Sequence, residues 1–298
     1  MLSLSGLADV AAAHRGQLDL PLPPLLIGDR VMDVDARPAI MGTVNLSRDS
    51  TYRESVATSA ESAVRKARVM AAQGADVVDI GAESSTARAV RVSSEDQVRA
   101  LVPVIERLVD EDILVSAETY EPVVVRASLK AGARMLNLTG TGDGEEILEL
   151  AAEFEATVVL CYVGGANVRE ITDVVLGEDP IPRLLEHFGD RIETARRLGV
   201  ERIVIDPGMG FYYGNLVDPA ARAQHQARVI LNSFRLRTLG VPVCNAMPHA
   251  FDLFEDQFRT AEGFFAVLGR LGGTSVFRTH EVAHVAAVLG AMGTLNVE

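Results

Sequence analysis

The chain has 298 residues and carries 41 acidic side chains against 28 lysines and arginines, a formal net charge of −13. A protein with this much negative charge repels nucleic acids and anionic membranes, which argues against both as partners. No run of about 18 apolar residues occurs, which predicts no transmembrane helix, and the N-terminus has no basic segment followed by an apolar run, which predicts no signal peptide and a cytoplasmic protein.

Residues 1–38 precede the regular part of the pattern and are expected to form an N-terminal extension. Within them, residues 25–35 read LLIGDRVMDVD, in which two apolar runs flank a Gly-Asp pair. This arrangement is typical of a β-hairpin with a tight turn. We expect the hairpin to cover one end of the domain that follows.

From residue 39 onward, short apolar runs rich in Val and Ile alternate with longer stretches. The runs are continuous in hydrophobicity, as in parallel strands that are buried on both faces. Cys161 and Cys244 lie within two of these runs, so we interpret them as buried, reduced thiols. The expected strands are 39–46, 76–83, 113–119, 134–140, 157–163, 202–208, 241–247 and 274–280.

The stretches between the strands place apolar residues on one helical face. Residues 59–75 contain the signature of a helix end, because Gly74 stands after the last turn. Residues 93–110 open with Ser-Ser-Glu-Asp, which supplies a cap and an acidic first turn. The expected helices are 59–75, 93–110, 121–131, 145–155, 180–198, 217–238, 256–272 and 281–293.

Strand, loop and helix therefore recur eight times, which predicts an α/β fold with a single (β/α)8 TIM barrel over residues 39–298. A doubly wound open sheet is the alternative. It usually has fewer strands and a Gly-rich phosphate-binding fingerprint after the first strand, and we find no such fingerprint here.

Polar side chains stand near the ends of the predicted strands, where the active site of such a barrel lies. Buried polar groups are costly unless each finds a partner, so we interpret the set as a binding site. Its members are Asn45, Asp79, Glu83, Glu118, Thr119, Asn137, Cys161, Tyr162, Asp206, Asn245, Arg278, Thr279 and His280.

The residue types indicate the kind of ligand. Glu118, Asn137 and Asp206 would present carboxylates and an amide to a flat heterocycle with N–H and NH2 donors, as in a pterin or guanine. A ring without those donors would leave a carboxylate unpaired, so discrimination against it is large. Arg278 and His280 alternate on one strand and share a face, and with Asn45 they would form a small anion site suited to phosphate.

Six short segments follow one another in the order of known strand-end motifs. They are IMGTVNLSRDS (40–50), DIGAESS (79–85), VSAETY (115–120), MLNLTG (135–140), IDPGMGF (205–211) and FRTHEV (277–282). Together they resemble the dihydropteroate synthase family of the pterin-binding barrel superfamily. The resemblance covers roughly residues 38–292, and the Asp-Pro-Gly segment is its closest match.

The resemblance implies a transferase that condenses a hydroxymethyl-dihydropterin diphosphate with 4-aminobenzoate, or another amine, and releases diphosphate in folate biosynthesis. In the family the pterin methylene becomes cationic before the arylamine attacks. By the same resemblance, the pterin is bound by Glu118, Asn137 and Asp206, and the diphosphate by Asn45, Arg278 and His280.

The resemblance also implies a metal and a catalytic set. Asn45 would be a ligand of Mg2+, the implied cofactor. Asp49 would order the loop after the first strand around diphosphate and arylamine. The catalytic residues implied are therefore Asp49, Asp206 and Arg278.

One departure from the family concerns the second substrate. The family's seventh-strand Ser-Arg-Lys, whose Lys contacts the pterin beside the arylamine pocket, is replaced by Ala246, Met247 and Pro248. We therefore expect a divergent member of the family, which retains the pterin-binding residues but has different residues in the pocket for the second substrate. The candidates to substitute for the lysine are Arg48, Arg88 and His249.

Two other functions remain open at this point. A non-catalytic pterin-binding paralogue is favoured by the loss of Ser-Arg-Lys. A pterin-dependent methyltransferase is disfavoured by Arg278 and His280, because a methyl donor carries no diphosphate. The partners expected are a pterin diphosphate and a small arylamine, and the apolar helix HVAAVLGAMG (284–293) predicts a homodimer.

Overall fold

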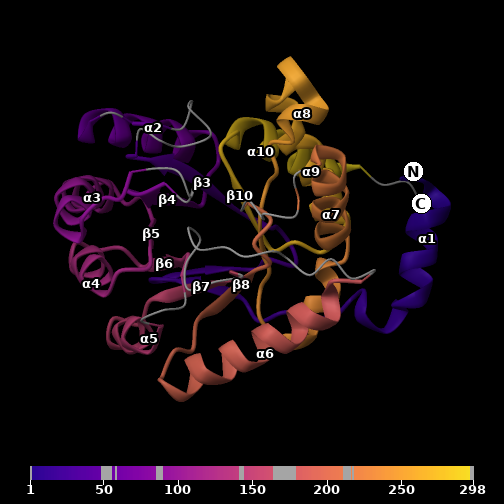
Figure 1. The fold of residues 1–298 in the computed structure, drawn as a ribbon, viewed down its shortest axis with the longest axis horizontal. Coiled ribbons are helices and arrows are strands. Elements are labelled where there is room, and N and C mark those ends of the chain that lie inside the picture. The colour runs from indigo at the N-terminus through magenta and orange to yellow at the C-terminus, as the bar shows by residue number, and fades with distance from the viewer. Residues whose placement is uncertain are drawn as a thin grey trace.

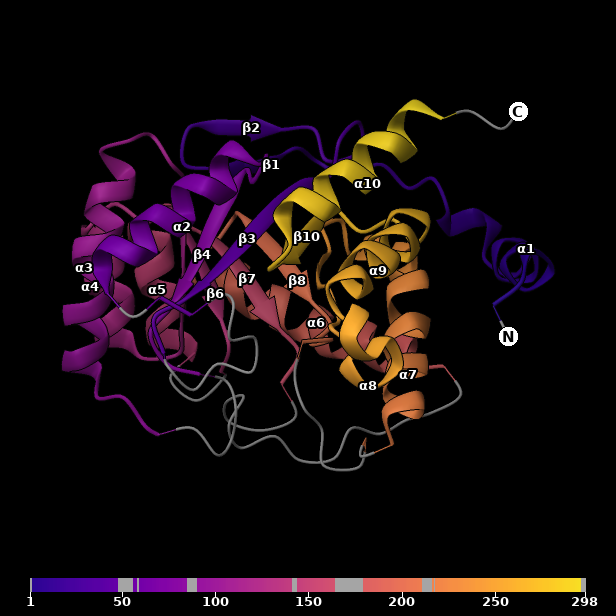
Figure 2. The same cartoon turned by 90° about the horizontal axis from the view of Figure 1, so that it is seen from above.

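The computed structural model describes most of the chain (Figures 1 and 2). The residues described are 2–47, 56–57, 59–84, 90–140, 144–163, 179–210, 216 and 218–295. Within them, no helix has both the length and the apolar composition that crossing a membrane requires.

Eight parallel strands form the centre of the molecule, in the order β8-β7-β6-β5-β4-β3-β10-β9. Ile205 of β8 also forms a parallel bridge with Val243, just before β9, and this bridge between the two outer strands brings the sheet close to closure. The strands are β3 (Ala39–Asn45), β4 (Val77–Gly81), β5 (Val115–Thr119), β6 (Met135–Leu138), β7 (Thr157–Cys161), β8 (Ile203–Asp206), β9 (Cys244–Ala246) and β10 (Val276–Thr279).

Helices form an outer layer around the strands (Figure 1). The capping signals read from the sequence operate as expected: the Ser93 hydroxyl accepts the Asp96 amide at 3.2 Å, and Gly74 adopts φ 106° after the last turn of its helix. The helices are α2 (Ala60–Ala72), α3 (Ser94–Val109), α4 (Pro122–Lys130), α5 (Gly144–Glu153), α6 (Ile181–Arg197), α7 (Pro219–Leu231), α8 (Phe251–Phe254), α9 (Arg259–Leu271) and α10 (Val282–Thr294).

The expected hairpin is present, as β1 (Leu25–Ile27) and β2 (Arg30–Met32), which pair antiparallel around Gly28. It lies across the end of the barrel at which the strands begin (Figure 2). Leu25 and Ile27 are buried in one apolar cluster with residues of the barrel interior, such as Met135. The Thr157 hydroxyl donates to the Leu26 carbonyl, so the hairpin covers the bottom of the barrel.

The eight-stranded barrel confirms the predicted fold class and excludes the open-sheet alternative. Three details differ from the sequence interpretation. The short helix α8 (Phe251–Phe254) lies outside every expected element. The extension also contains a helix, α1 (Leu4–Ala13), with a short 3-10 turn at Arg15–Gln17. The single helix expected at 217–238 is α7 followed by a 3-10 segment at Ser233–Leu239, because Asn232 leaves helical geometry at φ −101°, ψ 9°.

Candidate active site

Adjacent strands place four of the motif positions side by side. In the parallel register, Asn45 of β3 pairs with Gly81 of β4, Gly81 with Glu118 of β5, and Glu118 with Asn137 of β6. Paired residues of a parallel sheet project to the same face. A Cβ on Gly81 would lie 3.4 Å from the Cβ of Glu118, so glycine leaves room for the carboxylate.

Arg278 of β10 joins two carboxylates at the barrel mouth. Its Nε donates to Asp79 Oδ2 at 2.8 Å, and its Nη2 donates to Glu118 Oε2. The side-chain amide of Asn137 donates to the same Asp79 oxygen at 2.9 Å, and Ser116 Oγ donates to Asp79 Oδ1 at 2.7 Å. Asp79 is fully buried. Its carboxylate is held in place by these three donors.

Asp206 stands at the end of β8, where the Asp-Pro-Gly motif turns the chain out of the barrel. Its Oδ1 accepts the Gly208 amide at 2.7 Å, and Gly208 adopts φ 81°, which an L side chain rarely tolerates. The carboxyl is 4% exposed. Both cysteines are free and buried, as expected, and Cys161 Sγ contacts Asn137 Oδ1 at 3.2 Å.

Burial shifts the pKa values of these acids. It raises the Glu118 pKa to about 7, against the attraction of Arg278 and with added repulsion from Asp79 and Asp206. It raises the Asp206 pKa to about 6, a shift that the Gly208 amide and Arg278 moderate. Burial alone would lower the Arg278 pKa, but Glu118 and Asp79 outweigh it and raise it, so Arg278 stays a cation.

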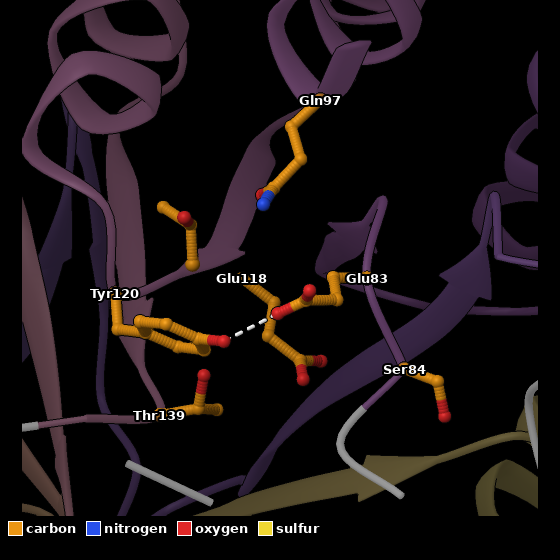
Figure 3. Close-up of a pocket in the computed structure, with 7 residues that line it drawn as sticks. Glu83, Ser84, Gln97, Glu118, Tyr120 and Thr139 are labelled. Atoms are coloured by element: carbon orange, nitrogen blue, oxygen red, sulfur yellow. Dashed lines mark hydrogen bonds between the residues drawn. The ribbon is translucent and has the colours of Figure 1, made fainter. Parts of the chain in front are cut away.

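Glu83, after β4, holds the segment that leads into α3 against the barrel mouth. Its carboxylate accepts the Tyr120 hydroxyl and, at 3.0 Å, the Val92 amide. Arg91 Nη1 donates to the Tyr120 hydroxyl at 2.8 Å. Glu83 and Tyr120 border a small cavity that Glu118 also lines (Figure 3).

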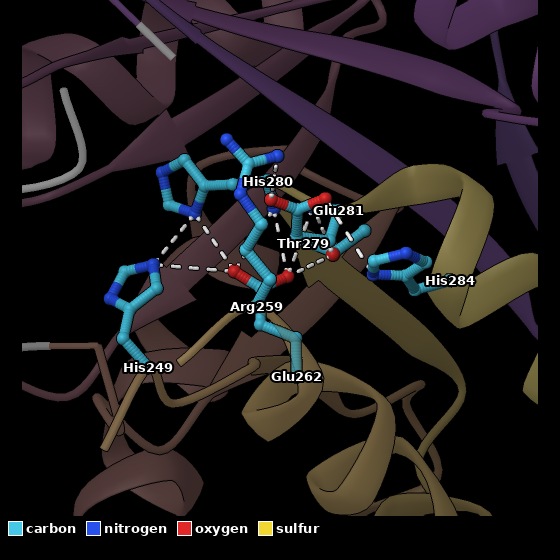
Figure 4. Close-up of polar contacts among 7 residues, drawn as sticks. All are labelled: His249, Arg259, Glu262, Thr279, His280, Glu281 and His284. Carbon is cyan, nitrogen blue, oxygen red and sulfur yellow. Dashed lines mark hydrogen bonds and ion pairs between the residues drawn. The ribbon is translucent and has the colours of Figure 1, made fainter. Parts of the chain in front are cut away.

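His280, just after β10, belongs to a second polar group, with His249 and Glu262 (Figure 4). His280 Nδ1 lies 3.1 Å from His249 Nε2, and Glu262 Oε1 lies 3.3 Å from the first nitrogen and 3.2 Å from the second. Burial would raise the Glu262 pKa, but the hydrogen bonds from the two imidazoles outweigh it and hold that pKa well below its usual range.

The structure brings most of the predicted site residues to one end of the barrel. Glu118, Asn137 and Arg278 share one hydrogen-bonded network through Asp79, and the charge of Asp206 acts on Glu118. Arg278 and His280 take different partners, which the shared strand face alone did not predict. The predicted residues Arg48, Asp49 and Arg88 lie outside the described residues.

The seventh strand lacks cationic side chains where the family has Arg and Lys. Ala246 and Met247 are 7% and 3% exposed, and Met247 packs within the main apolar core. The Met247 amide donates to the Arg278 carbonyl at 2.8 Å, so the segment keeps its place beside β10. His249, two residues after Met247, reaches β10 through its side chain, because its Nε2 lies 3.1 Å from His280 Nδ1.

Two residues of this region have contacts that the sequence did not predict. Asp79 belongs to the predicted set of strand-end residues, but its place as the common partner of Arg278, Asn137 and Ser116 depends on long-range contacts. Glu262 is outside that set, although the sequence carries a signal for it: it precedes Phe265 by three residues on the buried face of α9, where an acid is unusual.

The sequence matches the model of the family described as "Pterin binding enzyme" over residues 41–280. It is 31% identical over 225 residues to the dihydropteroate synthase of Synechocystis, covering 74% of this chain and 75% of that one. It is also 32% identical over 297 residues to a probable bifunctional folylpolyglutamate synthase/dihydropteroate synthase of Halobacterium salinarum, covering 97% of this chain but 35% of that one.

Solved structures agree with these matches. Dihydropteroate synthase of Xanthomonas albilineans with 4-aminobenzoic acid superposes with a TM-score of 0.76 at 30% identity, covering 92% of this chain and 100% of that chain. The same enzyme with 7,8-dihydropteroate gives a TM-score of 0.72 at 28% identity, with the same coverage. The chain therefore belongs to the dihydropteroate synthase family of pterin-binding enzymes.

Proposed function

We propose that the chain is a dihydropteroate synthase-type transferase, which joins a hydroxymethyl-dihydropterin diphosphate to an arylamine and releases diphosphate. The observation that carries the proposal is the buried cluster of Asp79, Glu118, Asn137 and Arg278 at the barrel mouth, with Asp206 beside it, in a chain of this family. Curated and solved relatives named dihydropteroate synthase support the same reading.

The proposed pterin-binding residues match the hydrogen-bond donors that a pterin ring presents. Asp206, when ionised, accepts two parallel hydrogen bonds from a ring N–H and the exocyclic amine. Glu118 and Asn137, on neighbouring strands, contribute further polar contacts to the ring. A ring without these donors would leave buried carboxylates unpaired, which provides the selectivity.

In the proposed reaction, positive charge develops on the pterin methylene and negative charge on the departing diphosphate. When the bond between the pterin methylene and the diphosphate oxygen breaks, the electron pair leaves with diphosphate and the methylene becomes cationic. The amine nitrogen of the second substrate then bonds to that carbon and loses a proton. Arg278 and His280 are proposed to attract the departing diphosphate, and Asp49 to order the loop around it.

Magnesium is the cofactor that the family implies, and the donor set of this site fits it in part. Mg2+ takes oxygen ligands, keeps several waters and is commonly held by few protein groups together with substrate phosphates. Asn45, at the end of β3, offers one amide oxygen. We propose that Asn45 and diphosphate oxygens hold Mg2+, which would neutralise charge on the leaving group.

The test is diphosphate release from hydroxymethyl-dihydropterin diphosphate with Mg2+, measured with and without 4-aminobenzoate, for the natural chain and for Asp206→Asn. Release that requires 4-aminobenzoate and is lost in Asp206→Asn is expected. Pterin binding by calorimetry without release for any arylamine would support the non-catalytic paralogue instead, which the missing Ser-Arg-Lys keeps as a second candidate. No pterin binding would refute both.

Further predictions concern the whole protein. We propose that the barrel comprises residues 39–298, that the protein is cytoplasmic, and that it forms a homodimer through the outer face of α10. In support of the dimer, only Val282 and Val285 of this apolar helix are buried. Light scattering after size exclusion tests it: a monomer at micromolar concentration would contradict the dimer.

A further inference from the structure

A closed triangle of three ligand atoms lies beside the end of β10. His249 Nε2 and His280 Nδ1 are 3.1 Å apart, and Glu262 Oε1 is 3.2 Å and 3.3 Å from them. Each pair is therefore at hydrogen-bonding distance. The three residues come from the loop after β9, from α9 and from the end of β10, so the triangle depends on the tertiary fold (Figure 4).

Protons cannot satisfy all three sides of this triangle. Each imidazole nitrogen offers either one N–H or one lone pair, and an ionised carboxylate only accepts. If both nitrogens donate to Glu262, two N–H groups face each other at 3.1 Å. If only one donates, the lone pair of the other nitrogen faces the carboxylate oxygen. Every assignment leaves one contact between like groups.

A metal ion satisfies all three atoms at once, because each then directs a lone pair to the same centre. Ligands held about 2.0 Å from a tetrahedral ion are about 3.3 Å apart. The sides of 3.1, 3.2 and 3.3 Å have that size. We propose that His249, Glu262 and His280 form a three-ligand site for a divalent transition metal ion.

The surroundings of Glu262 hold its carboxylate in the required orientation. The carboxylate is fully buried, and its Oε2 accepts the Thr279 hydroxyl, the His280 amide at 3.0 Å and the Glu281 amide at 3.2 Å. These donors fix Oε2 and direct Oε1 toward the imidazoles. Outer hydrogen bonds of this kind orient the ligands of metal sites in general.

The chemistry of the ligands selects the ion. Two imidazoles and one carboxylate suit Zn2+, Fe2+ or Co2+, whereas Mg2+ prefers oxygen ligands throughout. The site therefore differs in kind from the oxygen site proposed at Asn45. Three protein ligands leave a coordination position for water or for a substrate oxygen.

Metal binding is tested on the full chain after chelation and dialysis. Zn2+ and Co2+ are titrated by calorimetry, and Co2+ is also followed by its visible absorption. One ion per chain is expected, with His249→Gln weakening the affinity about 100-fold or more, since outer partners alone contribute about 10- to 100-fold. His284→Gln is the matched control, because His284 is a nearby imidazole outside the triangle, 3.7 Å from Glu281.

Two results would overturn the site. One is no stoichiometric binding by the natural chain, which would make the triangle a structural hydrogen-bonded tie. The other is an equal loss of affinity in His249→Gln and His284→Gln, which would indicate surface histidines. Glu262→Gln serves as a third variant if circular dichroism shows that it folds, and the same loss as in His249→Gln is expected.

A second arm rests on the proposed function. Because His280 stands two residues after Arg278, just beyond the end of β10, the ion would lie next to the proposed diphosphate site. Inorganic diphosphate is expected to bind more tightly to the Zn2+-loaded natural chain than to the metal-free chain, with no such gain in His249→Gln. Metal binding with unchanged diphosphate affinity would refute this placement. Metal binding in a chain that releases no diphosphate would refute the proposed function and leave the metal site standing.

Discussion

At the scale of single residues, the acids at the barrel mouth have opposite effects on ligand binding and on folding: their ionised form is suited to bind the ligand but destabilises the folded state. Asp206 is 4% exposed, and its pKa of about 6 lies above the ordinary aspartate value. A raised pKa means that folding favours the protonated form. Asp206 is therefore neutral in both states well below its ordinary pKa of about 4, and it destabilises the folded state progressively as the pH rises from about 4 to about 6.

The first prediction follows from the direction of the Asp206 pKa shift. Asp206→Asn should be more stable than the natural chain at pH 8, by on the order of 1–3 kcal/mol in the free energy of unfolding, because one pKa unit corresponds to about 1.4 kcal/mol. Its amide oxygen can still accept the Gly208 amide. Urea unfolding at pH 4 and pH 8 measures it. A difference that is the same at both pH values would contradict the explanation.

The affinity for the pterin should depend on pH in the opposite sense. Asp206 must be ionised to accept two hydrogen bonds, so lowering the pH below about 6 protonates it and weakens binding, by up to about tenfold per pH unit. Glu118, at about 7 and facing Arg278, Asp79 and Asp206, begins the loss at higher pH. Calorimetry with hydroxymethyl-dihydropterin from pH 5 to 8 tests this, and a flat profile would refute it.

At the scale of elements, the strands and helices were largely predictable because their signals are local. The eight expected strands each contain the observed one, from β3 (Ala39–Asn45) to β10 (Val276–Thr279). Continuous apolar runs and helix caps act over a few residues, so a pattern along the chain reveals them. The helix α1 was not predicted, because none of its residues is buried and its apolar residues are spread around the helix more evenly than in α3.

The side-chain contacts of the site were less predictable for the same reason. Motifs identified Asp206 and Arg278, but the sharing of Asp79 by Arg278 and Asn137 spans 199 and 58 residues of sequence. The triangle of His249, Glu262 and His280 joins three elements and matches no sequence motif that we recognised. Such contacts depend on how the elements are placed around the barrel.

The packing of α9 against α7 gives the third prediction. A Cβ on Gly272, at the end of α9, would overlap the Ile230 carbonyl oxygen and lie 2.8 Å from the Leu231 Cα. Because these atoms are backbone, they cannot rotate away. Gly272→Ala should lower the free energy of unfolding by about 1–3 kcal/mol or more.

Gly189 provides the matched control. It lies within α6, away from the proposed dimer face of α10, and a Cβ there would meet nothing within 4 Å. Gly189→Ala should therefore raise stability by about 0.5–1 kcal/mol, because alanine is the better helix former. Urea unfolding compares the two variants. Equal effects would show that the close approach of α9 to α7 is less strict than the distances indicate.

At the scale of the whole molecule, the N-terminal extension has two parts that are expected to contribute differently to the stability of the fold. The helix α1 lies at the edge of the molecule and has no buried residue (Figure 2), and its Leu7, Val10 and Ala11 line an open cavity that α7 and α9 border on the other side. The hairpin buries Leu25 and Ile27 against the barrel interior. Asp35, just after the hairpin, accepts the Leu22 amide at 3.0 Å and pairs with Arg237, so this part is anchored.

The last prediction separates these parts. A chain that lacks residues 2–18 should fold and unfold at nearly the same urea concentration as the natural chain, because it loses no buried side chain. Ile27→Ala, in the full chain, should cost about 2–5 kcal/mol, since Ile27 is fully buried in the barrel's lower core. Val31→Ala is the control, because Val31 is 66% exposed on the same hairpin and its truncation should have little effect. If removing residues 2–18 destabilised the protein as much as Ile27→Ala, the extension would act as one unit, and the barrel would depend on α1 as well as on the hairpin that covers its bottom.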